Sequence, residues 1–95
     1  MRTPKTKERV VITGLGVISP VGSGPGEFFD NLMAGRSGIR RVDLPFADRL
    51  SVRIAGTVPD FDPAAHFTKM QLSGMERFSQ MALVAARQAA RDAGL

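Results

Sequence analysis

Two glycines, Gly14 and Gly16, come shortly after the apolar residues 10–12, and this spacing is typical of the start of a dinucleotide-binding turn. In that fingerprint a third glycine stands three residues later and a helix starts at once, so that its N-terminus binds the pyrophosphate. Here the position holds Ser19, and the following Pro20 lacks an N–H and favours an extended conformation before it. We therefore predict an extended chain whose glycines admit a closely packed neighbour. NAD, FAD or ATP binding at residues 14–22 is the minor alternative.

The other residues that could do chemistry are few. His66 is the only histidine and the chain has no cysteine, so no set of ligands with metal-site spacing is present. The lack of cysteine also excludes a disulfide and a thiolate nucleophile within these 95 residues. Asp60 and Asp62 each lie one residue from a proline and are typical of turns rather than of paired catalytic carboxylates. The residues alone predict no catalytic group, cofactor site or metal site here.

The remaining polar and sulfur-containing side chains suggest ordinary structural positions. Lys69 and Ser73 are four residues apart, as are Arg87 and Arg91, which is typical of solvated helix positions. The methionines are predicted to fill the core; they are Met70, Met75 and Met81.

Composition limits the class of protein. The 95 residues carry a net charge of +4 and are 43% hydrophobic, which suits at most one small packed domain. Residues 1–8 are predicted to be a solvated basic tail, and no interleaved aromatics accompany it, so nucleic-acid binding is disfavoured. No apolar run approaches the ~18 residues of a membrane span, and no signal-peptide pattern is present. We expect a cytoplasmic protein that binds neither nucleic acid nor membrane.

The elements that would position these residues begin with a strand. Residues 9–18 are apolar on both faces, which is typical of a strand buried between neighbours on both sides. A helix is predicted next, because Pro25 suits its first position, Gly24 can precede it, and Glu27 lies near its positive N-terminus. Gly35 predicts the end of that helix.

The middle of the chain is predicted to be less regular. Residues 36–50 read as a loop, and residues 51–58 read as a half-exposed strand with Val52 and Ile54 on its apolar face. Prolines and aspartates then indicate turns, and residues 63–67 could form one helical turn.

The longest predicted helix covers residues 73–93. Ser73 and Glu76 form a capping-box pattern at its start, and Gly94 predicts its end. Its buried face is mostly alanine, so whatever packs there must come close; the alanines are Ala82, Ala85, Ala86, Ala89 and Ala93.

Taken together, these patterns resemble the start of a β-ketoacyl-acyl-carrier-protein synthase, a condensing enzyme with the thiolase fold. The resemblance covers almost the whole chain from residue 9 onward. It rests on several blocks in the family's order: Gly14-x-Gly16-x-x-x-Pro20-x-Gly22 within 9–22, then 34–39, 52–56, 61–63, 75–80 and 93–95.

The resemblance implies an α/β fold, of which residues 9–95 would be the N-terminal portion of a layered α/β/α/β/α arrangement. It also implies decarboxylative condensation of acyl and malonyl thioesters through a cysteine thiolate and two histidines, with acyl carrier protein as partner and a homodimer as the full-length form. None of these catalytic residues matches a position in this chain, and His66 matches neither histidine. We therefore expect a 3-oxoacyl-acyl-carrier-protein synthase as the full-length enzyme and no activity from this chain alone.

One departure concerns the carrier protein. Many bacterial members of the family have two or three cationic residues just before the position of Met75 that help to dock the acidic carrier. Here these positions read Leu72-Ser73-Gly74, and only Lys69 remains nearby as a carrier contact. Three alternatives stay open: a non-catalytic partner subunit that resembles a chain-length factor, a stand-alone basic binding module, and the disfavoured dinucleotide-binding fragment.

Overall fold

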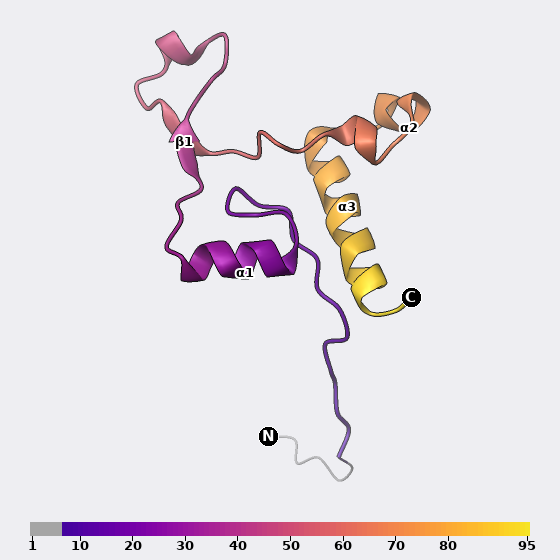
Figure 1. The fold of residues 1–95 in the computed structure, drawn as a ribbon. Coiled ribbons are helices and arrows are strands. Elements are labelled where there is room, and N and C mark those ends of the chain that lie inside the picture. Colours follow the sequence, from indigo (N-terminus) through magenta and orange to yellow (C-terminus); the bar gives the residue numbers. More distant parts are fainter. Residues whose placement is uncertain (1–6) are drawn as a thin grey trace, which may run out of the picture.

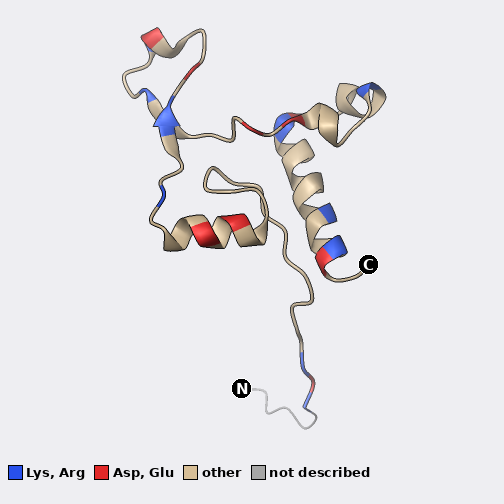
Figure 2. Cartoon of the chain, viewed as in Figure 1, with Lys and Arg blue, Asp and Glu red and all other residues tan. Residues whose placement is uncertain are grey.

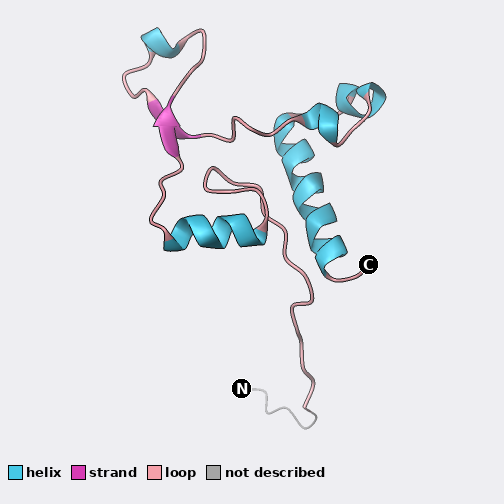
Figure 3. Ribbon diagram, viewed as in Figure 1, coloured by secondary structure: helices cyan, strands magenta, loops and turns pink. Residues whose placement is uncertain are grey.

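Within residues 7–95, the part of the chain that the computed structural model describes, helical and strand segments are joined by long irregular stretches (Figures 1 and 3). The predicted basic tail, residues 1–8, falls almost wholly outside this part. Helices and strands are both present, as the α/β prediction requires. In chain order the elements are α1 (Pro25–Met33), β1 (Ile39–Arg41), the 3-10 turn η1 (Ala47–Arg49), β2 (Ile54–Gly56), the 3-10 turn η2 (Pro63–Ala65), α2 (Lys69–Ser73) and α3 (Arg77–Asp92).

Helix α1 forms where its capping residues predict it. Pro25 takes the first helical position, where its missing N–H costs nothing, and Gly24 precedes it with a φ of 116°. Gly35 ends the helix in the left-handed region, with a φ of 71°. The amide of Asn31 donates to the carbonyl of Val21 at 2.6 Å, which ties the helix to the preceding turn.

The predicted strand at residues 9–18 is not a strand in this structure. Residues 7–17 have no regular secondary structure, and only Ile18 makes an isolated antiparallel bridge, with Ser23. Val10, Val11 and Ile12 are 98%, 63% and 82% exposed, so the predicted burial is also wrong here. The physical reason is that a strand needs a neighbouring strand to pair with, and the described residues supply none to this segment beyond the bridge at Ile18.

The middle of the chain contains a small hairpin that the sequence predicts only in part. Strands β1 and β2 pair antiparallel, with Arg40 opposite Ala55, so residues 36–50 are not wholly a loop. The predicted strand at 51–58 shortens to β2. Val52 and Ile54, its predicted apolar face, are 67% and 62% exposed because no layer within residues 7–95 covers them.

The predicted helix at residues 73–93 divides into two. Helix α2 ends with Ser73, and α3 begins at Arg77 and ends at Asp92, before Gly94 with a φ of 80°. The predicted capping box at Ser73 is wrong, because the real capping box belongs to α2. There the hydroxyl of Thr68 accepts from the Gln71 N–H at 3.2 Å, and the Gln71 side chain accepts from the Thr68 N–H at 2.9 Å.

A small core joins α3 to the segment before it. Phe61, Phe67 and Val84 are buried and form this core. Gln80 of α3 is also buried, and its side-chain amide donates to the carbonyl of Met75 at 3.2 Å. The partly buried residues packed on this core are Ile18, Val58, Leu72, Met75 and Met81. The prediction of core methionines thus holds for Met75 and Met81 and is wrong for Met70, which is 85% exposed.

The glycines pack on alanines of α3, a pairing that the sequence did not indicate. Ala85, Ala89 and Ala93 are partly buried, whereas Ala82 and Ala86 are exposed, so the predicted buried face is wrong for these two. A Cβ at Gly14 would overlap the carbonyl oxygen of Ala89 and stand 2.9 Å from the Cβ of Ala93. A Cβ at Gly16 would overlap the carbonyl of Ala85. We call this contact between residues 14–16 and α3 the glycine–alanine seam. Only glycine on one side permits two backbones to approach so closely.

The described residues do not close into a compact body. The radius of gyration is 18.1 Å, whereas a compact domain of this length has about 12 Å. The accessible surface is 8048 Å² for 10.2 kDa, whereas a compact monomer of that mass exposes about 5300 Å². None of the helices in residues 7–95 is long and apolar enough to cross a membrane.

Candidate functional site

The turn after the glycines has its own closed set of hydrogen bonds. Ser19 and Gly22 exchange backbone bonds of 3.1 and 3.3 Å, and the Ser19 hydroxyl accepts from the N–H groups of Val21 and Gly22. The next helix begins only at Pro25. The chain therefore does not enter a helix from Gly16, as a phosphate-binding turn does, and the predicted extended path is confirmed. Absence of nucleotide binding stays a prediction.

An open hollow of about 640 Å³ lies beside this turn and α1. Two cationic and two acidic residues line it: Glu27, Arg36, Arg40 and Asp60. The Arg40 guanidinium already donates to the carbonyl of Thr57 at 2.8 Å. This balance of charges gives no electrostatic preference for a phosphate group.

Aromatic and arginine side chains form a layered stack over the core. The rings of Phe61 and His66 lie nearly parallel, with centroids 5.8 Å apart, and Phe67 meets His66 edge-on at 6.4 Å. The guanidinium of Arg77 lies 5.3 Å from the centre of the Phe61 ring, and that of Arg87 lies 4.7 Å from the centre of Phe67.

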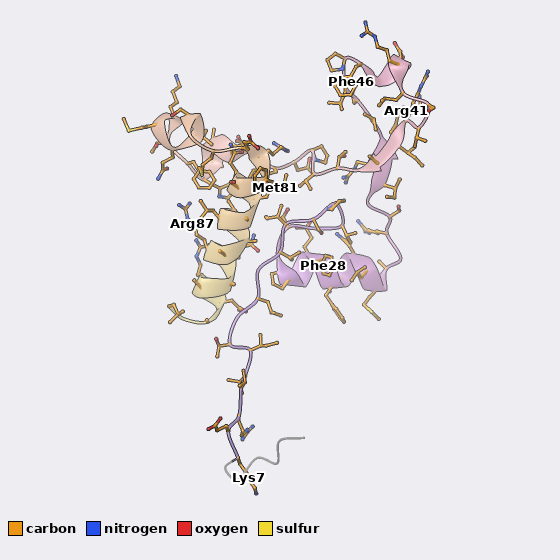
Figure 4. The ribbon with its side chains drawn as sticks, turned by 180° about the vertical axis from the view of Figure 1, so that it is seen from behind. Lys7, Phe28, Arg41, Phe46, Met81 and Arg87 are labelled. Carbon is orange, nitrogen blue, oxygen red and sulfur yellow. The ribbon has the colours of Figure 1, made fainter. Side chains whose placement is uncertain are left out.

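Hydrogen bonds hold both arginines in place. Arg77 donates to the carbonyl of Val58 at 2.8 Å, and Arg87 donates to the carbonyl of His66 at 3.1 Å. Figure 4 shows Arg87 projecting from the side of α3. Arg87 is thus not merely a solvated position, and His66, exposed at the end of η2, is a stacked turn residue.

Lys69, the one predicted contact residue, is the first residue of α2 and is exposed. It is the only charged side chain on this short helix, which Figure 2 shows beside the start of α3. The three positions before Met75 have other roles: Leu72 packs on the core, the Ser73 hydroxyl donates to the carbonyl of Met70, and Gly74 ends the helix. Lys69 therefore lies at the surface, and its contact with a carrier protein stays a prediction.

Metal-ligating side chains do not gather in the described part of the chain. No three His, Cys, Asp or Glu side chains within residues 7–95 could hold one ion. Asp60 is in a turn, and the carboxylate of Asp62 accepts from the N–H of Ala64 at 3.1 Å at the start of η2. Asp62 therefore shapes a turn, as predicted.

The sequence matches the family model for the N-terminal domain of β-ketoacyl synthases over residues 7–95. The chain belongs to this family. Among curated relatives it is 42% identical over 89 residues to a 3-oxoacyl-[acyl-carrier-protein] synthase 2 of Coxiella burnetii, covering 94% of this chain and 22% of that protein. It is 44% identical over 94 residues to the tetracenomycin polyketide synthase ketoacyl synthase alpha subunit of Streptomyces glaucescens, covering 98% of this chain and 22% of that one.

Solved structures of ketosynthases have the same arrangement. The ishigamide ketosynthase/chain length factor superposes with a TM-score of 0.74 at 42% identity, over 90% of this chain and 21% of that chain. A β-ketoacyl synthase from Burkholderia phymatum gives 0.71 at 34% identity, over 88% of this chain and 21% of that one. The chain thus spans about a fifth of the length of the ketosynthases it matches.

Sequence reasoning missed the stack of Arg77 and Arg87 on the aromatic rings. No local spacing indicates it, because each arginine meets an aromatic residue sixteen or more positions earlier, 61 to 77 and 67 to 87. Contacts between residues so far apart in the sequence leave no pattern that sequence reasoning could use. Only the fold of residues 58–67 against α3 brings them together.

Proposed function

We propose that this chain is the N-terminal part of a β-ketoacyl-acyl-carrier-protein synthase, an acyltransferase of fatty-acid or polyketide synthesis. The whole enzyme would have the layered thiolase-like fold, act as a homodimer in the cytoplasm and condense acyl and malonyl thioesters. The observation that carries the proposal is the family match, which extends over residues 7–95.

The role of this segment in that enzyme is architectural. With no cysteine in the chain, the thiolate that takes the acyl group must come from elsewhere in the enzyme. In the proposed reaction the thiolate displaces the carrier thiol from the acyl thioester. Loss of CO₂ from the malonyl thioester then gives a carbanion, which attacks the enzyme-bound acyl carbon and releases the thiolate. Residues 7–95 would support the sheet and the helix layer that position these groups.

A hybrid enzyme tests this proposal. In the Coxiella burnetii synthase, the 89-residue segment that matches this chain is replaced by the corresponding residues of this chain. We expect the hybrid to condense acyl- and malonyl-carrier protein within about tenfold of the parent rate. The matched control is the same hybrid with Gly16→Val. Its new side chain would overlap the backbone of α3 at the glycine–alanine seam, so we expect this variant to lose activity. A correctly folded dimeric hybrid without turnover would overturn the proposal.

A second candidate is a non-catalytic partner subunit, because one similar structure is the ishigamide ketosynthase/chain length factor. The described residues do not separate the two functions. Reading the coding sequence on either side of this segment distinguishes them. A cysteine at the family's nucleophile position would favour the enzyme, and another residue there would favour the partner subunit.

The proposed partner is an acyl carrier protein, with Lys69 as a contact. Lys69 is exposed and cationic, and carrier proteins of this family are acidic, so the charges are complementary. In the hybrid, Lys69→Glu should lower kcat/KM for carrier-linked substrates about threefold to tenfold, because a charge at the edge of an interface acts mainly on association. Arg49→Glu, exposed in η1, is the matched control. Equal values of kcat/KM for the two variants would show that Lys69 does not contact the carrier protein.

A further inference from the structure

A smaller hollow lies on the side of α3 that faces away from the glycine–alanine seam. Arg87 and Arg91 line it, and each is two residues along the helix from alanines of the seam, which places both on roughly the opposite face. His66, at the end of η2, lines the hollow from the other side. Its volume is about 300 Å³, at the lower end for small-molecule sites, so it suits protruding side chains of a partner better than a whole substrate.

The charged residues around this hollow have one sign. Among the described residues its lining contains no Asp or Glu, whereas two acidic residues line the larger hollow beside α1. Lys69 follows Phe67 by only two residues, and Figure 4 shows Arg87 projecting from α3 toward the side where Figure 1 places α2. We call Lys69, Arg87 and Arg91, together with His66, the cationic strip.

Arg87 is held in place before any partner binds. Its guanidinium lies 4.7 Å from the centre of the buried Phe67 ring, and one nitrogen, Nη1, donates to the carbonyl of His66 at 3.1 Å. A guanidinium has five N–H donors in a fixed fork, so further donors remain for a carboxylate. Because the side chain is already ordered, binding an anion here costs less conformational entropy than at a mobile arginine.

Arg91 adds a second cation one turn further along α3, where it is exposed. Like charges four residues apart on a helix repel each other, and an anion bound between them relieves the repulsion. Burial of an unpaired cation is costly, so an apolar layer of polypeptide is a poor cover for Arg87 and Arg91. The strip therefore suits either water or a partner that brings carboxylates.

We propose that the cationic strip docks carboxylates of the acyl carrier protein, with Arg87 as its anchor. The inference rests on the proposed function, which supplies the acidic partner. The three positions before Met75 are neutral in this chain, so the complementary charge must lie elsewhere. The β1–β2 hairpin also carries arginines, but Asp43 and Asp48 lie among them, so its charges are mixed. The hollow between Arg87 and Arg91 has no acidic lining that would weaken its attraction for the carrier.

Substrates with and without the carrier protein test the inference in the hybrid synthase. Rates are measured with acyl- and malonyl-carrier protein and, separately, with acyl and malonyl thioesters of N-acetylcysteamine, which have no protein surface. Arg87→Gln and Arg91→Glu should each lower the ratio of the two kcat/KM values about tenfold, because only the carrier-linked substrates meet the strip. Arg49→Glu, exposed in η1, is the control and should change this ratio by less than about twofold.

Direct binding and rescue identify the contact. Fluorescently labelled carrier protein is titrated with the hybrid, and Arg91→Glu should raise the Kd about tenfold and make it less sensitive to salt. A carrier variant with one Asp or Glu changed to Lys should restore most of the affinity of Arg91→Glu, which a merely structural effect would not allow. Arg91 is exposed and lies outside the core, so this variant decides even if Arg87→Gln disturbs folding.

Equal losses with both kinds of substrate would show a structural role and overturn the docking surface, as would an unchanged ratio and affinity in both variants. Binding to anionic vesicles or to DNA that Arg91→Glu abolishes, with carrier affinity unchanged, would assign the strip to another anion and also overturn the inference. A folded hybrid that binds the carrier through the strip without turnover would support the inference and overturn the proposed function. An active hybrid whose strip variants behave like the parent would do the reverse.

Discussion

Gly14 and Gly16 differ from most other glycines of the chain in what surrounds them. A Cβ on either would meet the backbone of α3, whereas Gly26 and Gly74 have nothing within 4 Å of the Cβ position. The requirement for glycine is therefore one of space at the seam, and neither Gly14 nor Gly16 has a positive φ. The Gly14-x-Gly16 pattern, which suggests a nucleotide-binding turn, is therefore explained by the close packing of this segment against α3.

Gly16→Val should destabilise the hybrid synthase by at least about 1–3 kcal/mol, because the new side chain overlaps a helix backbone that cannot move aside. Urea denaturation of the hybrid measures the change. Gly26→Ala, within α1, is the control and should stabilise the hybrid by up to about 1 kcal/mol through helix propensity. A Gly16→Val hybrid as stable as its parent would mean that the seam does not form.

At the scale of elements, the two helices of the C-terminal half show which capping signals act. Thr68 and Gln71 exchange reciprocal bonds at the start of α2, whereas Glu76 precedes α3 without any side-chain cap. Both sequence patterns look alike, and only one lies at a helix start. The difference arises because Gly74 ends α2 and the chain turns before α3 begins.

Thr68→Ala and Ser73→Ala in the hybrid separate the two capping patterns. Thr68→Ala should cost about 1 kcal/mol of stability, since the Gln71 N–H loses its partner. Ser73→Ala should change stability by no more than about 0.5 kcal/mol, because its hydroxyl bonds only the carbonyl of Met70 in its own helix. Thermal or urea unfolding of both variants measures the change in stability. A larger loss of stability from Ser73→Ala than from Thr68→Ala would favour the single helix over residues 73–93.

Local signals predicted the elements that depend on local chemistry. Pro25 and Gly35 bound α1 as expected, and the glycines and the alanines of α3 each make close contacts as expected, although no local pattern indicated that they meet each other. The strands were predicted less well, because a strand exists only through a partner distant in sequence. β1 pairs with β2 by a register that no local pattern indicates, and within the described chain residues 9–18 pair with no strand beyond the single bridge between Ile18 and Ser23. For the site, the exposure of Lys69 was predictable and the stacked arginines were not.

At the scale of the whole molecule, the described chain is extended and its core is small. Three apolar side chains are buried, and the radius of gyration exceeds that of a compact domain by about half. We therefore expect the free 95-residue chain to aggregate or to self-associate rather than to form a stable monomer. Sedimentation with circular dichroism tests this, and a sharp cooperative melt from a 10.2 kDa monomer would contradict it.

The free chain should also lack condensing activity, because it has no cysteine to form an acyl-enzyme. The measurement is incubation of the purified chain with acyl- and malonyl-carrier protein, followed by product analysis against a buffer control. The hybrid synthase is the positive control. Turnover by the free chain alone would mean that the chemistry differs from that of the family.

The apolar surface that the free chain leaves in water has a thermal consequence. Val10, Ile12 and the other exposed apolar side chains are hydrated before assembly, and removal of apolar surface from water lowers the heat capacity by about 0.45 cal/mol/K for each Å². In the proposed enzyme, the enthalpy of packing these residues against the rest of the polypeptide therefore becomes more favourable on warming. Near room temperature the driving force is entropic, and it weakens as the solution is cooled. The packing of these apolar residues in the proposed enzyme should accordingly weaken when the solution is cooled.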